Sequence, residues 1–270
     1  MFTTRLISGI VLVAVALAVV ITGGPLLFAV TCAISMVGLF EFYRVLSIEK
    51  KAVGIAGYVM ALAYFALLWF GGKQYLELVV ILAVLVFMTI YVVTFPDYKT
   101  EEVTGAFFGV FYVPVMLSYL YQTRMIPDGK YLVWLIFLSS WGCDTCAYCV
   151  GMLFGKHRLA PVLSPKKSIE GAVGGVVGAA LLGLIYGAVF GGHMLEVDSP
   201  LLACAAACAI AAVISQIGDL AASAVKRNHD VKDYGHLIPG HGGVLDRFDS
   251  MLFTAPAIYF AVNFLAVSIL

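Results

Sequence analysis

Charged residues are scarce in this sequence. Only 12% of its 270 residues are Asp, Glu, Lys or Arg, and 62% are hydrophobic, whereas an average soluble domain has about 25% charged residues. This composition excludes an ordinary soluble globular fold. The 16 basic residues balance the 16 acidic ones, so the chain has no excess positive charge to attract nucleic acid.

The sequence also lacks a disulfide pattern, a long linker and a low-complexity tract. Its six cysteines lie in apolar stretches rather than in loops, so we interpret them as small apolar packing residues. We expect one integral membrane domain over residues 1–270, with the N-terminal spans in 1–125 and the catalytic spans and loops in 126–270.

Apolar runs fill most of the chain. A helix needs about 20 apolar residues to cross a bilayer core of roughly 30 Å, and nine runs come close to that length. After the first run the chain lacks the Ala-x-Ala site of a signal peptide, so we expect this run to be retained as a span. The sequence predicts an all-α, polytopic membrane helical bundle with about nine transmembrane helices. The nine runs are Leu6–Thr22, Pro25–Phe42, Val53–Gly71, Tyr75–Phe95, Val103–Tyr121, Leu132–Phe154, Ile169–Gly191, Leu201–Val225 and Ser250–Leu270.

The positions of Lys and Arg predict the orientation of this bundle. With nine spans, 13 of the 16 basic residues fall on the same side as the N-terminus, and only Lys73, Arg124 and Lys130 fall on the other. Positive loops are retained in the cytoplasm. We therefore expect an N-in, C-out protein of the cell (inner) membrane whose active site faces the cytoplasm.

The seventh run contains small residues at helical spacing, which allow two helices to approach closely. We interpret this pattern first as packing inside the bundle, with a homodimer through these faces as the alternative. The small residues are Gly171, Gly174, Gly175, Gly178, Gly183, Gly187 and Gly191.

The loop after the sixth run is basic and leads into a helix start. Ser164, Lys166 and Lys167 precede Ser168, an expected N-cap, and Glu170 follows in the first turn. Lysines beside a helix N-terminus can bind phosphate, since the free backbone N–H groups and the dipole both favour an anion. Retention of positive charge in the cytoplasm also explains these lysines, so both interpretations stay open.

The loop after the eighth run holds most of the remaining polar residues. Helical spacing predicts that Asp219 and Ser223 share a face with the cations Lys226 and Arg227. A glycine turn follows, in which His241, Gly242 and Gly243 let backbone amides approach a ligand closely. Asp246, Arg247 and Asp249 come next. Carboxylates, cations and a glycine turn together indicate metal-assisted phosphate chemistry.

Two of the acids are misplaced for a membrane protein. Asp144 and Asp219 lie in runs that lead into the basic loops, so both belong in the cytoplasmic half of the bilayer. A charged side chain there usually faces a polar cavity or a partner. We expect a functional cavity, with a structural pair to Lys or Arg as the alternative.

These residues resemble the signature of the phosphatidate cytidylyltransferase (CDP-diacylglycerol synthase) family. The signature elements appear in order as Ser223-Ala-Val-Lys226-Arg227, Lys232-Asp233, Pro239-Gly240-His241-Gly242-Gly243 and Asp246-Arg247-Phe-Asp249. The segment 164–171 is similar to the family's Ser-Pro-Lys-Lys-Thr-Trp-Glu-Gly, with Ser168 and Ile169 in place of Thr and Trp.

The resemblance implies transfer of CMP from CTP to phosphatidic acid with Mg²⁺ as cofactor. We expect Asp219 and Asp246 to hold Mg²⁺, with Asp249 and Asp144 assisting, and a second metal ion is an alternative. We expect the phosphates to bind the basic residues and the glycine turn, and Ser223 to be a ligand or hydrogen-bond donor. The expected catalytic set is Asp219, Ser223, Lys226, Arg227 and Asp246, of which the two cations also neutralise phosphate charge. The expected phosphate-binding set is Ser164, Lys166, Lys167, His241, Gly242, Gly243 and Arg247.

Two alternative functions are compatible with parts of the pattern. A CTP-dependent lipid kinase would also join a nucleotide to a membrane-held acceptor, but it would release CDP rather than pyrophosphate. A cation-coupled transporter would use intramembrane acids such as Asp144, but it would need polar groups on both sides of the membrane.

Overall fold

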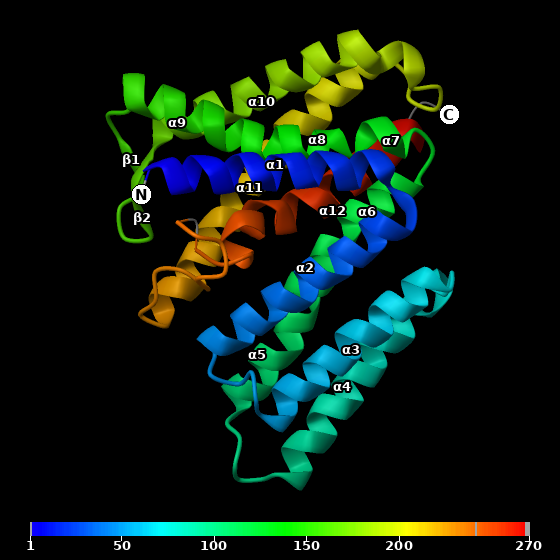
Figure 1. Ribbon diagram of the computed structural model, residues 1–270, viewed down its shortest axis with the longest axis vertical. Coiled ribbons are helices and arrows are strands. Elements are labelled where there is room, and N and C mark those ends of the chain that lie inside the picture. The colour runs from blue at the N-terminus through cyan, green and yellow to red at the C-terminus, as the bar shows by residue number, and fades with distance from the viewer. Residues whose placement is uncertain (1, 241, 268–270) are drawn as a thin grey trace.

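The apolar runs fold as helices in the computed structural model, which describes residues 2–240 and 242–267. The first half of the chain forms α1 to α4 and then a bent helical stretch, α5, η2 and α6 (Figure 1). Pro114 lies inside η2, where its missing N–H interrupts the α-helical ladder. The bounds are α1 (Phe2–Thr22), α2 (Gly24–Val45), α3 (Ala52–Trp69), η1 (Lys73–Tyr75), α4 (Leu76–Val93), α5 (Thr100–Val110), η2 (Phe111–Val115) and α6 (Met116–Met125).

The second half carries the two polar loops. A segmented stretch ends in α9, a hairpin of two strands follows, and the hairpin leads into α10. The loop 229–244 then joins α11 to α12. The bounds are α7 (Gly129–Leu132), α8 (Trp134–Phe137), η3 (Leu138–Gly142), α9 (Cys143–Phe154), β1 (Arg158–Ala160), β2 (Ser164–Ser168), α10 (Ile169–Phe190), η4 (Gly191–His193), α11 (Pro200–Asn228) and α12 (Leu245–Val267).

The β1–β2 hairpin is a local exception within the helical fold that the sequence predicts. The strands are antiparallel, with Arg158 opposite Ser168 and Ala160 opposite Ser164. Pro161 and Pro165 lie in this segment, and proline disfavours a helix interior, so the segment forms strands instead. The fold is otherwise helical, as the sequence predicts.

The helices are those of an integral membrane protein. Helix covers part or all of each of the nine predicted runs. Among the described residues, seven helical stretches are long and apolar enough to cross a membrane, and the part of α1 from Ser8 to Thr22 is a shorter apolar segment. In α4 only 17% of the most apolar window is buried, so its apolar surface needs lipid or another apolar partner. Nine spans and the N-in, C-out orientation stay predictions.

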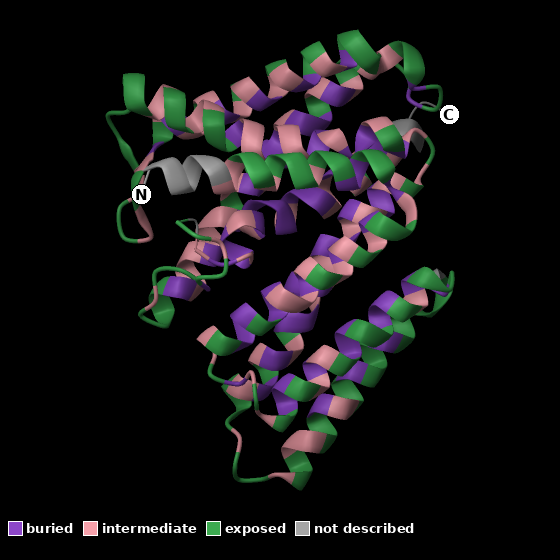
Figure 2. Cartoon of the chain, in the orientation of Figure 1, coloured by how far each residue is buried: buried purple, intermediate pink, exposed green. Residues whose placement is uncertain are grey.

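The polar loops gather at one end of the bundle. Figure 1 shows the β1–β2 hairpin, the first turns of α1 and the loop after α11 on one side of the molecule. The connections α6–α7 and α10–α11 lie on the opposite side. Figure 2 shows buried residues where α8, α11 and α12 meet, and a largely exposed outer face on α1.

The glycines of α10 pack inside the chain. A Cβ atom on Gly178 would lie 2.5 Å from Cβ of Cys146 in α9, and one on Gly183 would lie 2.5 Å from the carbonyl oxygen of Cys204 in α11. Both glycines therefore permit close helix contacts within the bundle. The structure supports internal packing for these faces.

Candidate functional site

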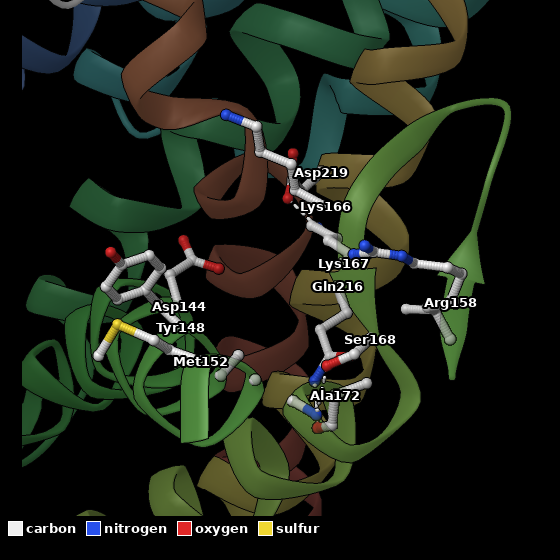
Figure 3. Close-up of a pocket in the computed structure, with 14 residues that line it drawn as sticks. Asp144, Tyr148, Met152, Arg158, Lys166, Lys167, Ser168, Ala172, Gln216 and Asp219 are labelled. Carbon is white, nitrogen blue, oxygen red and sulfur yellow. Dashed lines mark hydrogen bonds and ion pairs between the residues drawn. The ribbon is translucent and has the colours of Figure 1, made fainter. Parts of the chain in front are cut away.

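A cavity of about 510 Å³ opens between α9, the hairpin, α10 and α11. In this first cavity, Asp144, Tyr148 and Met152 lie on one side and Arg158 and Lys167 on the other (Figure 3). The hairpin brings the basic residues over α11, because β2 runs directly into the N-terminus of α10. The lining residues are Asp144, Ala147, Tyr148, Gly151, Met152, Arg158, Leu159, Lys166, Lys167, Ser168, Gly171, Ala172, Gln216 and Asp219.

Lys167 and Asp219 form an ion pair across the first cavity. Their side chains are 28% and 25% exposed, so the pair remains accessible to a ligand. Arg158 and Lys166 line the same cavity and make no ion pair with another described residue. The cavity therefore holds one carboxylate neutralised by a lysine and two further cations that can bind an anion.

The start of α10 is arranged as the sequence predicts. Ser168 is the N-cap, and its Oγ accepts a hydrogen bond from the backbone N–H of Gly171 at 3.1 Å. Glu170 accepts hydrogen bonds from the backbone N–H of Lys156 at 3.1 Å and from the His157 side chain at 2.6 Å. Glu170 therefore fastens the loop before the hairpin, which keeps the basic strand β2 in place.

A second cavity of about 220 Å³ lies between α1, η3, α9 and the first turns of α12. Asp144 lines this cavity as well as the first one, so it marks the junction of the two. The Nε atom of Arg247 is buried and has no hydrogen-bond partner in the described part of the chain. A buried, unpaired guanidinium atom at a cavity indicates a site for an anion. The lining residues are Ser8, Gly9, Leu12, Val13, Trp141, Asp144, Asp246, Arg247, Asp249 and Ser250.

Asp246 organises the loop before α12. One of its oxygens accepts a hydrogen bond from Lys226 Nζ at 2.8 Å. The other accepts from the backbone N–H groups of Tyr234, at 2.8 Å, and Gly243, at 3.0 Å. Lys226 also lies 4.0 Å from Asp249. These contacts join the end of α11 to the start of α12 through a buried pair.

Tyr234 closes this arrangement from the loop side. Its ring centroid lies 5.2 Å from Lys226 Nζ, and its hydroxyl donates to the carbonyl of Ala222 at 3.1 Å. The residue is 1% exposed, and this burial raises the pKa of its phenol. Tyr234 therefore acts as a neutral packing residue beneath the loop.

Glu41 is a residue of the site that the sequence analysis missed. Its carboxylate in α2 accepts hydrogen bonds from the backbone N–H groups of Val244 and Leu245, at 3.0 and 2.8 Å, and thus caps α12. Nearby, Arg44 donates to the carbonyl of Tyr234 at 2.6 Å. An acid inside the apolar run Pro25–Phe42 is the signal that could have identified it, because such acids usually have a partner.

Gln216 is the second missed residue. It lines the first cavity one turn before Asp219, and its side chain donates to the carbonyl of Ala172 at 2.9 Å. It therefore connects α11 to α10 beside the lysines.

Several predicted residues lie away from the two cavities. Ser223 is half-buried on α11, and Arg227 is exposed and donates to the carbonyl of Val231 at 3.1 Å. Neither is among the described residues that line the cavities. Ser164 begins β2 and is half-buried, and His241 lies outside the described residues.

The glycine turn lies against Asp246. Gly242 has φ +87°, and a Cβ atom there would lie 2.9 Å from the carboxylate of Asp246. Glycine is the residue that fits this backbone conformation without strain. Gly242 is thereby packed against Asp246, which lines the second cavity.

The carboxylates fit a hard divalent cation only together with a substrate. Among the described residues, no group of three or more His, Cys, Asp or Glu side chains is placed to hold a metal. Asp144, Asp219 and Asp249 nevertheless lie close enough for their charges to act on one another. Mg²⁺ is usually bound by one or two carboxylates together with substrate phosphates and water. These acids match that pattern.

The sequence is similar to known proteins over nearly its whole length. The model of the Cytidylyltransferase family matches residues 3–265. The phosphatidate cytidylyltransferase of Staphylococcus saprophyticus is 31% identical over 261 residues, which cover 94% of this chain and 96% of the relative. That of Bacillus subtilis is 31% identical over 264 residues, with 95% and 96% covered. That of Staphylococcus aureus is 29% identical over 262 residues, with 94% and 96% covered.

Proposed function

The chain belongs to the cytidylyltransferase family, and from this membership we propose that it transfers CMP from CTP to phosphatidic acid, giving CDP-diacylglycerol and pyrophosphate. The observation that carries the proposal for the site is that Asp144 lines both polar cavities. Two substrates held in adjoining cavities can react where the cavities meet.

The first cavity suits the triphosphate of CTP. Lys167 and the unpaired cations Arg158 and Lys166 line it, and such cations neutralise phosphate charge. Ser164 begins the same strand as Lys166 and Lys167, so we assign it a hydrogen bond to phosphate. His241, Gly242 and Gly243 are proposed to contact phosphate from the glycine turn.

The second cavity suits the phosphate of the lipid. Arg247, whose Nε atom is buried and unpaired among the described residues, lines it together with Asp249. We propose that an oxygen of the lipid phosphate attacks the α-phosphorus of CTP while the bond to the β-phosphate oxygen breaks and pyrophosphate leaves. A phosphate monoester is largely dianionic at pH 7, since its second pKa is about 6. No general base is therefore needed, and the protein positions the phosphates and neutralises their charge.

The carboxylates are proposed as the metal-binding groups. Asp219 and Asp246 would hold Mg²⁺, with Asp144 and Asp249 assisting. A site for two ions in the same group of acids is the alternative. When bound, Mg²⁺ supplies positive charge to the reacting phosphates. Asp246 already accepts three hydrogen bonds. A carboxylate has about four acceptor positions, so one remains for a metal.

The remaining residues of α11 are proposed to support this site. Lys226 holds the carboxylate of Asp246, and through it the second cavity. Ser223 lies one helical turn after Asp219, and we assign it as a hydrogen-bond donor to substrate. Arg227 is exposed, and we assign it to the attraction of CTP from solution.

We further propose that the site faces the cytoplasm of an N-in, C-out protein in the inner membrane. The excess of basic residues on that side supports this orientation. Membrane lipids then surround the apolar helices. A homodimer through the glycine faces is left out of the proposal, because α9 and α11 contact Gly178 and Gly183 within the chain.

The test is an assay of the purified protein in detergent with CTP, phosphatidic acid and Mg²⁺. We expect equal amounts of pyrophosphate and CDP-diacylglycerol. We expect Asp144→Asn to lower the rate by about ten- to a hundredfold, because it would weaken the hold of the site on Mg²⁺. The matched control is Asp198→Asn, an exposed acid in the connection α10–α11, which should keep the wild-type rate. Release of CDP with a phosphorylated lipid would instead indicate a kinase.

A further inference from the structure

A third cavity of about 370 Å³ lies between α1 and α2. Its walls are apolar apart from Ser8 and Thr31, and α6, α8, α12 and the loop 237–244 complete it. None of the groups assigned to catalysis lines this cavity among the described residues. The lining residues are Ser8, Val11, Leu12, Val15, Ala16, Val19, Val20, Leu27, Val30, Thr31, Ile34, Leu120, Phe137, Leu237, Ile238, Pro239, Val244 and Phe248.

The third cavity continues the second one. Ser8 and Leu12 line both cavities, and Ser8 donates a hydrogen bond to the carbonyl of Pro239 at 3.2 Å. Helix α1 is thus a common wall, with Arg247 and the carboxylates at one end and an apolar space beyond. A polar end with an anion site joined to an apolar space is complementary to a phospholipid.

The length and the opening of the third cavity also fit a lipid chain. The lining residues of α1 run from Ser8 to Val20, which is about 18 Å at the rise of an α-helix. One leaflet contributes about 15 Å to a hydrocarbon core of roughly 30 Å. Val11 and Val15 line the cavity and are also 54% and 52% exposed, so the cavity reaches the outer surface of the bundle. A chain can therefore enter sideways from the bilayer.

We propose that the third cavity holds an acyl chain of the lipid substrate while the lipid phosphate lies in the second cavity beside Arg247. This inference rests on the proposed function. It adds the position of the lipid substrate and the helices that contact its acyl chain. Helices α1 and α2 form the acyl-chain wall, and the loop residues Leu237 to Pro239 cover its end nearest the site. Burial of the chain against these side chains provides the affinity.

The first experiment fills the cavity and compares two lipids. Ala16 lines the cavity, whereas Ala14 on the same helix is exposed and is not among its described lining residues. We expect Ala16→Phe to lower kcat/KM for dioleoyl phosphatidate by at least about tenfold, as overfilling a packed site does. We expect a much smaller loss for dibutyryl phosphatidate and an unchanged KM for CTP. Ala14→Phe should match the wild type with both lipids.

The second experiment needs no variant. A phosphatidate analogue with a diazirine near the end of one acyl chain is photolysed with the wild-type protein, and labelled peptides are identified by mass spectrometry. We expect labelling within 11–34, competed by dioleoyl phosphatidate. Labelling confined to peptides that contain no lining residue of the third cavity overturns the proposal. An Ala16→Phe protein that loses activity equally with both lipids, or with neither, also overturns it. A wild-type protein that makes no CDP-diacylglycerol from either lipid contradicts the proposed function. The labelling experiment needs no turnover, so it still tests whether the third cavity binds an acyl chain.

Discussion

Asp144 has a position that no other carboxylate of the site shares. It is the acid that lines both polar cavities, while Asp219 is paired with Lys167 and Asp246 with Lys226. An acid in a membrane-spanning helix is costly unless it has a polar environment. The two cavities supply that environment, and Asp144 makes no ion pair with another described residue, which favours the predicted functional cavity over a structural pair.

The buried pair of Lys226 and Asp246 provides a prediction about stability. The two side chains are 10% and 2% exposed, and removal of one partner leaves a buried charge without compensation. We expect Lys226→Met to lower the free energy of unfolding by about 3 kcal/mol or more, measured by denaturation in mixed detergent micelles. The control is Lys232→Met at an exposed position of the same loop. Equal stability of the two variants would show that the pair does not hold the loop.

Ser223 provides a prediction about activity. It lies one turn beyond Asp219 and is half-buried, and we assign it a hydrogen bond to substrate. Loss of a hydrogen bond to a charged group costs about 1.5–3 kcal/mol, so Ser223→Ala should lower kcat/KM by roughly ten- to a hundredfold. Pyrophosphate release measures this, and a thermal denaturation curve that matches the wild type shows that the fold is kept. Full activity in Ser223→Ala would remove Ser223 from the site.

At the scale of elements, the loop 229–244 is held by α2 as much as by its flanking helices. Glu41 caps α12 through the backbone N–H groups of Val244 and Leu245. A Cβ atom on Gly235 or Gly243 would collide with the same carboxylate. These two glycines therefore let the loop lie directly on Glu41, and the loop in turn positions Asp246.

The contact between Gly235 and Glu41 leads to a prediction for the loop. Gly235→Ala should displace Glu41 or the loop, because the new methyl group would occupy the place of a carboxylate oxygen. Overpacking of this kind costs about 1–3 kcal/mol, and we expect a lower melting temperature together with reduced turnover. Gly192→Ala is the matched control, since its Cβ would have no atom within 4 Å. A Gly235→Ala protein as stable and active as Gly192→Ala would contradict this role of Glu41.

The sequence predicted the helices better than the contacts between them. Apolar runs of sufficient length become helices because backbone groups in lipid must form their hydrogen bonds within the segment. Ser168 was correctly predicted as an N-cap, because capping also depends on residues close together in the sequence. The hairpin β1–β2 was missed because its strands have only three and five residues. Its two prolines also made the segment resemble a loop in the sequence. Glu41 was missed because its hydrogen-bond partners lie 203 and 204 residues further along the chain. A contact between residues so far apart in one sequence cannot be read from local patterns.

The candidate site was predicted by residue type but only in part by position. Asp144, Lys167 and Asp219 do line one cavity, and Arg247 and Asp249 line the next. Helical spacing placed Arg227 on the face of Asp219, yet its side chain turns toward the carbonyl of Val231 where α11 ends. Periodicity describes a helix interior, and the last turn is governed by the loop that follows.

For the whole molecule, sidedness is the property that decides whether the site can reach a soluble nucleotide. The hairpin, the start of α1 and the loop after α11 share one side of the bundle, and the connections α6–α7 and α10–α11 share the other (Figure 1). Basic residues are concentrated on the first side and sparse on the second. Since positive loops stay in the cytoplasm, this arrangement predicts that the side with the site is cytoplasmic.

Cysteine labelling in intact cells tests this orientation. Lys232→Cys lies in the loop 229–244 and Asp198→Cys in the connection α10–α11, and both positions are exposed. A membrane-impermeant maleimide applied to intact spheroplasts should label Asp198→Cys but not Lys232→Cys, and both should be labelled after lysis. The wild-type protein, with its own cysteines, gives the background. The reverse pattern would place the site outside, where CTP from the cytoplasm could not reach it, and the proposed reaction would then lack its nucleotide.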